Sequence, residues 1–130
     1  MKDKLQFYIN GKWVESESNE RIEIINPANE ELIGHVTSGT KEDINKAVSA
    51  ASDAFQTYQF SSKEDRIEIL KNIITEYENR YDDLVQVITE EMGAPTWLSQ
   101  KAQASTGIKN LHETLDALKE YEFEKKEGDY

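Results

Sequence analysis

Residues 5–14 read Leu5-Gln6-Phe7-Tyr8-Ile9-Asn10-Gly11-Lys12-Trp13-Val14, and this stretch predicts the first element of the fold. Its apolar residues recur at every second position up to Ile9, a period that is typical of a β-strand. Asn10 and Gly11 follow at once, and because both tolerate a positive φ they favour the tight turn of a hairpin. The next three residues are then the return strand.

Two further short strands are expected before residue 40. The first runs through Ile22, Ile24 and Ile25, and the second covers residues 32–36. The segment Asn26-Pro27-Ala28-Asn29 separates them and predicts a turn, because proline has no N–H for a strand ladder. We therefore interpret residues 1–39 as a β-hairpin and meander.

Residues 40–120 have almost no Gly or Pro, and their apolar residues recur at helical spacing. Thr40 with Asp43 predicts a capping box at the start of one helix. Ser61 or Ser62, followed by two acidic residues, predicts the start of the next helix, and a break is expected near Asn79.

The sequence also predicts where the helices in this region end and restart. Gly93 stands where a helix C′ residue would stand, and Pro95 prevents continuation. A last helix is expected from about Thr96 through Leu118, which makes about four helices in all. Gly107 lies inside that helix and indicates the close approach of a neighbour, since glycine is otherwise unfavourable there by about 1 kcal/mol.

Composition excludes several classes of function. The 130 residues include 26 acidic and 15 basic residues and no cysteine, for a net charge of −11. Nucleic acid and an anionic membrane surface would repel such a chain. It offers no disulfide, no thiolate nucleophile and no cysteine-bound zinc. No run of apolar residues is long enough to span a bilayer, and the first residues lack the apolar segment of a signal peptide, so we expect a cytoplasmic protein.

A search for catalytic groups by type finds no constellation. His35 and His112 have no companion motif, and the pairs of acidic residues are expected by chance in so acidic a chain. Gly34 and Gly39 frame no dinucleotide-binding fingerprint. Trp13 and Trp97 lie beside turns and are interpreted as packing residues.

An ordered set of motifs nevertheless resembles a known family. The set comprises residues 7–14, Ile24-Ile25-Asn26-Pro27-Ala28-Asn29-Glu30, Lys41-Glu42-Asp43-Ile44-Asn45-Lys46-Ala47-Val48, Arg66-Ile67-Glu68-Ile69-Leu70 and Glu91-Met92-Gly93-Ala94-Pro95. In this order and at this spacing the set looks like the amino-terminal part of an NAD(P)-dependent aldehyde dehydrogenase, over nearly the whole chain. One departure is visible: Tyr58-Gln59-Phe60 stands where the family usually has a tryptophan, which exchanges one aromatic packing residue for another.

The resemblance implies an α/β parent protein with a Rossmann-like nucleotide-binding domain. Residues 40–120 would be the helical outer part of that domain. Residues 121–130 would begin the strand arm that bridges subunits of a homo-oligomer, either a dimer or a tetramer. The nucleophilic cysteine, the general-base glutamate, the oxyanion-stabilising asparagine and the main contacts to NAD or NADP would all lie beyond residue 130. This segment would thus be scaffold, with no catalytic or cofactor-binding residue of its own.

Two local roles carry over from the family. Some members bind a monovalent cation between a backbone carbonyl and a carboxylate, at the positions of Ile25 and Glu91. The alternative for Glu91 is a surface acid at a helix end. The last helix often lines the aldehyde tunnel, which makes Thr106 and Asn110 candidate tunnel residues, with ordinary helix surface as the alternative.

A second hypothesis for the whole chain is a stand-alone acidic helical interaction module. A module should close its own core, whereas a segment of a larger enzyme should expose an apolar stripe, for example part of the face carrying Phe55, Ile74 and Leu111. A small hydrolase would need a nucleophile–base pair, and the sequence offers none.

Overall fold

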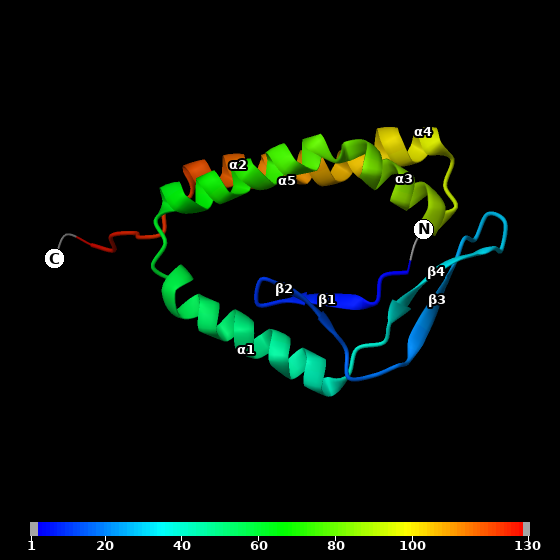
Figure 1. Ribbon diagram of the computed structural model, residues 1–130. Coiled ribbons are helices and arrows are strands. Elements are labelled where there is room, and N and C mark those ends of the chain that lie inside the picture. The colour runs from blue at the N-terminus through cyan, green and yellow to red at the C-terminus, as the bar shows by residue number, and fades with distance from the viewer. Residues whose placement is uncertain (1–2, 129–130) are drawn as a thin grey trace.

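The computed structural model describes residues 3–128 and places strands before helices, as the sequence predicts (Figure 1). The strands are β1 (Gln6–Ile9), β2 (Lys12–Glu15), β3 (Arg21–Ile25) and β4 (Leu32–Thr37). The helical part comprises α1 (Lys41–Tyr58), α2 (Lys63–Asn79), α3 (Tyr81–Met92), α4 (Thr96–Leu98), the π-helical segment η1 (Ser99–Gln103) and α5 (Ala104–Glu120).

The four strands form two antiparallel hairpins, β1–β2 and β3–β4. In the first, Phe7 pairs with Val14 and Ile9 with Lys12. Asn10 and Gly11 have φ values of 52° and 73°, the conformation that the Asn-Gly pair predicts. A parallel bridge between Lys4 and Val36 ties the start of the chain to the second hairpin.

Local sequence signals set the helix boundaries. The Thr40 and Asp43 side chains cap α1 reciprocally, and Ser62 and Asp65 do the same for α2. The predicted break falls at Arg80, between α2 and α3. Helix α3 ends at Gly93, which has a left-handed φ of 62°.

The last helix differs from its prediction as a single α-helix. Its first turn, α4, passes into the π-helical segment η1, where the Ala104 N–H donates to the Ser99 carbonyl five residues earlier, and only then into α5. A π-turn accommodates one extra residue without breaking the helix, so periodicity alone does not reveal it. Ser99 is fully buried in this turn, and its hydroxyl has no hydrogen-bond partner among the described residues.

The core lies between helices α2, α3 and α5. Its buried apolar residues are Ile74, Val85, Ala104 and Leu115. The Tyr77 hydroxyl of α2 donates to the Ala104 carbonyl at 2.8 Å. A Cβ built on Gly107 would overlap that same hydroxyl, so the predicted close approach at Gly107 is confirmed.

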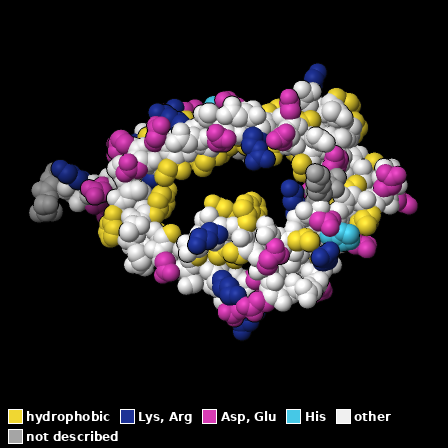
Figure 2. All heavy atoms as spheres, viewed as in Figure 1, with side chains coloured by type: hydrophobic (Ala, Val, Ile, Leu, Met, Phe, Trp, Pro, Cys, Tyr) yellow, Lys and Arg dark blue, Asp and Glu magenta, His cyan; other side chains and the backbone are white. Residues whose placement is uncertain are grey.

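The two parts of the molecule enclose an opening. Helix α1 and the β1–β2 hairpin face α2 and α5 across it (Figure 1), and hydrophobic side chains gather along its rim (Figure 2). Phe55 is 55% exposed, in line with the expected uncovered stripe. Ile74 is only 6% exposed, and for this residue the expectation is wrong because Ile74 belongs to the core between the helices.

The two tryptophans also depart from their interpretation as packing residues. Trp13 and Trp97 are 66% and 63% exposed, respectively. The Trp13 ring contacts Tyr8 edge-to-face at a centroid distance of 5.2 Å, and Tyr8 is itself exposed. Both tryptophans are thus available for packing against another surface.

Candidate functional site

One side of the predicted cation position is the hydrogen-bonded turn that follows β3. The Asn26 N–H donates to the Glu31 carbonyl at 2.9 Å, and the Glu30 N–H donates back to the Asn26 carbonyl at 2.8 Å. The Asn26 side chain accepts from the Ala28 N–H at 2.9 Å. Ile25 immediately precedes this network and lies next to an irregularity in the β3–β4 ladder.

The turn contacts the end of α3. A Cβ built on Gly93 would lie 2.7 Å from the Ala28 nitrogen and 3.1 Å from Asn26 Oδ1, so only glycine permits this approach. The segments that carry Ile25 and Glu91 therefore meet here. Glu91 is exposed. Among residues 3–128, no group of three or more His, Cys, Asp or Glu side chains could hold a metal ion.

The two candidate tunnel residues lie on α5, one turn apart and both exposed. The Thr106 hydroxyl donates to the Ala102 carbonyl at 2.6 Å, a local helix contact. The Asn110 carbonyl accepts from the Thr114 hydroxyl at 2.8 Å. The structure brings these residues together on one helix, and it places the cation candidates Ile25 and Glu91 on other elements.

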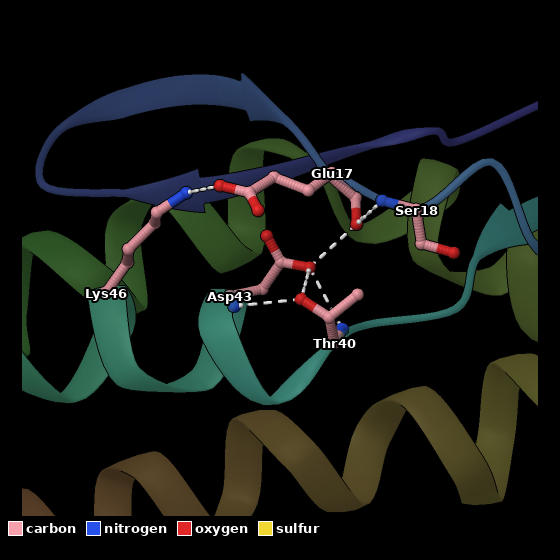
Figure 3. A network of polar contacts seen from close by, with 6 residues as sticks. Glu17, Ser18, Thr40, Asp43 and Lys46 are labelled. Atoms are coloured by element: carbon pink, nitrogen blue, oxygen red, sulfur yellow. Dashed lines mark hydrogen bonds and ion pairs between the residues drawn. The ribbon is translucent and has the colours of Figure 1, made fainter.

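A polar network joins the loop after β2 to the start of α1 (Figure 3). Asp43 is 5% exposed, and its Oδ2 accepts from the Ser16 hydroxyl at 2.7 Å, the Thr40 N–H at 2.9 Å and the Thr40 hydroxyl at 2.8 Å. These three hydrogen bonds, that from Ser16 above all, hold the pKa of the Asp43 carboxyl below its ordinary value. Lys46 pairs with Glu17 beside it, which raises the pKa of the Lys46 ammonium.

This network extends beyond what the sequence predicts. The capping box of Thr40 and Asp43 is a local signal, whereas Ser16 lies 27 residues from Asp43 and carries no signal of its own. The result is a carboxylate oxygen that accepts three hydrogen bonds and fixes the loop on the helix.

The two histidines take part in isolated pairs. His35 Nδ1 lies 3.1 Å from Asp3 Oδ1, and His112 Nε2 lies 3.8 Å from Glu78 Oε1. Each histidine thus lies beside one carboxylate.

Residues 13–129 match the sequence profile of the aldehyde dehydrogenase family. The chain belongs to this family. An aldehyde-dehydrogenase-like protein of Staphylococcus aureus (strain USA300) is 50% identical over 129 residues, which cover 99% of this chain and 27% of that protein.

Solved aldehyde dehydrogenases have the same fold over this region. The enzyme from Bartonella henselae superposes with a TM-score of 0.92 at 35% identity, covering 95% of this chain and 26% of that one. A mutant of aldehyde dehydrogenase C from Pseudomonas syringae, in complex with NAD+ and octanal, gives 0.91 at 34% identity, covering 95% and 25%. The predicted family and fold are thus confirmed. The chain spans about a quarter of the length of these aldehyde dehydrogenase relatives.

The residues that the structure describes, 3–128, do not form a cradle for a dinucleotide. Gly34 is buried in the β4 strand, Gly39 precedes α1, and Gly93 caps the carboxyl end of a helix instead of opening an amino end. Phosphate binding by an aldehyde dehydrogenase of the Rossmann type requires backbone N–H groups at a helix amino end next to a glycine-rich turn. No binding step is therefore assigned to NAD in this part of the chain. The described residues also contain no helix of the length and apolarity needed to cross a membrane.

Proposed function

We propose that this chain is the amino-terminal scaffold of an oxidoreductase that oxidises an aldehyde to a carboxylic acid with NAD(P)+. The supporting observation is the 50% identity that extends over 99% of this chain but only 27% of its relative. The Pseudomonas syringae neighbour, in complex with NAD+ and octanal, supports the class of cofactor and substrate. The competing proposal is a stand-alone acidic interaction module.

The chemistry would come from residues outside this segment. In the parent reaction a thiolate attacks the aldehyde carbon, and these 130 residues contain no cysteine. The segment would instead hold the outer helices in place, through the Asp43 network at the start of α1 and the contact of Gly93 with the turn after β3. Its part in catalysis is to support the residues that react.

A chimaera tests this proposal. The 129-residue segment of the Staphylococcus aureus relative that aligns with this chain is replaced by this chain. Aldehyde-dependent reduction of NAD+ is then measured by the appearance of NADH. We expect the chimaera to keep the turnover of the unaltered relative to within about tenfold, because a scaffold changes positioning and not the reacting groups. The 130-residue chain alone should give no NADH with any aldehyde.

Two outcomes would contradict the scaffold role. One is turnover by the isolated chain. The other is a folded, soluble chimaera with no activity, while a control chimaera built from another family member with matched identity is active. A native polypeptide of about 15.0 kDa in the source cell would favour the interaction module instead.

We further propose a monovalent cation between the Ile25 carbonyl and the Glu91 carboxylate of the parent protein. The contact of Gly93 with the Asn26–Ala28 turn supports this cation site, because the contact brings the segment with Ile25 close to the segment with Glu91. Glu91→Ala in the parent should lower the melting temperature more in potassium or sodium than in a large organic cation. Glu76→Ala, at an exposed position on α2, is the control. An equal loss in all salts would exclude the cation.

Thr106 and Asn110 are proposed to line the aldehyde tunnel, and residues 121–130 to begin the bridging arm of a cytoplasmic homo-oligomer, either a dimer or a tetramer. The exposure of the α5 face supports the first role. For the second, residues 121–128 are irregular in the structure, and residues 129 and 130 lie outside the described part. Thr106→Val in the chimaera should change KM between short and long aldehydes. Deletion of residues 121–130 from the chimaera should weaken its oligomer, measured by analytical ultracentrifugation, and an unchanged oligomer would contradict the bridging arm.

A further inference from the structure

The segment that follows α5 contacts the amino end of α2 through Lys63. The Lys63 ammonium donates to the Lys119 carbonyl at 2.6 Å and to the Tyr121 carbonyl at 3.0 Å. The last carbonyls of a helix have no partner within the helix, and a cation there also complements the negative end of the helix dipole. Lys63 thus caps α5 from another helix.

Arg66 lies one turn further along α2 and is held in a fixed orientation. Its Nε donates to the Ser61 hydroxyl at 2.9 Å, and its Nη2 donates to the Gln59 carbonyl at 3.2 Å. Both partners belong to the connection between α1 and α2. The guanidinium plane is therefore set by one side-chain hydroxyl and one backbone carbonyl of this corner.

Two aromatic rings contact the oriented guanidinium. Its Cζ lies 5.1 Å from the centroid of the Phe123 ring and 5.6 Å from that of the Tyr58 ring. Tyr58 is the last residue of α1, whereas Phe123 lies beyond α5. Phe123 also packs edge-to-face on Tyr121 at 4.9 Å. A cation within about 6 Å of an aromatic ring centroid is attracted to the ring face.

These contacts make one assembly from three distant parts of the chain, which we call the clasp (Tyr58, Lys63, Arg66, Tyr121 and Phe123). Four of its members, Lys63, Arg66, Tyr121 and Phe123, line an open surface hollow of about 530 Å³ between the α1–α2 connection and residues 121–124. In Figure 1 the chain beyond α5 crosses this corner before it leaves the molecule. An ordinary surface arginine offers a contrast: the Arg80 side chain is 70% exposed and makes one ion pair, with Asp83.

We propose that Lys63 and Arg66 are positioning residues that hold residues 121–124 against the α1–α2 corner and so set the direction in which the chain leaves α5. This role does not depend on the proposed enzymatic function. It concerns the path of the backbone and can be measured in the chain itself.

The absence of native cysteine makes a distance measurement specific. Spin labels are attached to Glu76→Cys on α2 and Lys125→Cys beyond the clasp, both at exposed positions. The distance distribution is recorded with the labelled chain diluted into an excess of unlabelled chain, so that only distances within one chain are measured. We expect one narrow peak in the doubly labelled chain in which no clasp residue is changed. Arg66→Gln or Lys63→Met should abolish the narrow peak, because each removes the cation and retains most of the side-chain length. Arg80→Gln is the matched control and should leave the peak unchanged.

A second pair of labels, at Glu76→Cys and Ala117→Cys, reports the packing of α2 on α5. This distribution should stay narrow in every variant, which separates loss of the clasp from loss of the fold. A broad distribution to Lys125→Cys before any clasp residue is changed would overturn the proposal. A narrow peak that survives both Arg66→Gln and Lys63→Met would also overturn it.

Discussion

Among single residues, Gly107 shows how tertiary contact can reverse a local preference. Alanine is preferred to glycine within a helix by about 1 kcal/mol. At this position, however, a Cβ would overlap the Tyr77 hydroxyl and lie 2.8 Å from Tyr77 Cζ. Overpacking of this kind costs about 1–3 kcal/mol, so the clash should outweigh the gain.

We therefore predict that Gly107→Ala lowers the free energy of unfolding by about 1 kcal/mol, measured by urea denaturation. Gly39→Ala is the control, because its new methyl group would meet Phe7 Cζ at an ordinary 3.5 Å. A stabilised Gly107→Ala variant would mean that the Tyr77 ring moves away freely.

The contribution of Asp43 to the stability of the fold depends on pH, and the sign of this dependence follows from the hydrogen bonds of its carboxylate. Its pKa in the folded chain lies below the ordinary value, first because of the Ser16 hydroxyl and then because of Thr40. The ionised carboxylate therefore stabilises the fold above the unfolded pKa, and this contribution is lost as the pH falls through the folded pKa, below about pH 4.

Asp43→Asn should accordingly be less stable than the unaltered chain at neutral pH, and the difference should shrink as the pH falls from about 5 to about 2. Stability is measured by urea denaturation at each pH. Asp53→Asn, at an exposed position on the same helix, is the control. If the difference stayed constant across this range, the charge of Asp43 would contribute nothing to stability.

Among the elements, the junction of α3 with the β3–β4 hairpin depends on Gly93. Its φ of 62° disfavours any side chain, and a Cβ would also lie 2.9 Å from the Ala28 Cβ. Gly11 supplies a matched control, because its φ is 73° but nothing lies within 4 Å of its would-be Cβ. The two positions share the cost of a left-handed backbone, and only Gly93 adds a clash.

Gly93→Ala should therefore be more destabilising than Gly11→Ala by at least about 1 kcal/mol. The difference in denaturant midpoint at constant m-value gives this quantity. Equal losses of unfolding free energy in the two variants would show that the contact between the helix end and the turn rearranges at no cost. The segments of Ile25 and Glu91 would then not be held together by this contact.

The elements that the sequence predicts well are those with local causes. Asn10 and Gly11 need only their own backbone preference, and the capping boxes of α1 and α2 need only residues three positions apart. The π-turn at Ser99 and the hydrogen bond from the Ser16 hydroxyl to Asp43 depend on packing between distant segments. The clasp around Arg66 is of the same kind, since Phe123 lies 57 residues away along the sequence (123 − 66). No local pattern records such contacts.

For the molecule as a whole, helix α1 shows why this segment does not close its own core. Asp43 is the only residue of α1 that is buried in the described structure, and its apolar residues Ile44, Val48 and Phe55 are 61%, 62% and 55% exposed. Phe60, just beyond the helix, is 82% exposed. An amphipathic helix of this kind normally buries its apolar stripe against another element. The opening in Figure 2 is where such an element would pack.

We predict that the isolated 130-residue chain binds the dye ANS and self-associates as its concentration rises, because exposed apolar patches favour association. ANS fluorescence and light scattering after size-exclusion chromatography measure the two effects. Val48→Glu and Phe55→Glu should reduce both without loss of helical circular dichroism, since neither side chain is buried. Gln56→Glu, at an exposed position of the same helix turned away from Phe55, should change neither. A monomer that binds no ANS at any concentration would mean that the chain covers this face by itself. That result would favour the interaction module over the enzyme scaffold, because a scaffold keeps its apolar face for the remainder of the enzyme.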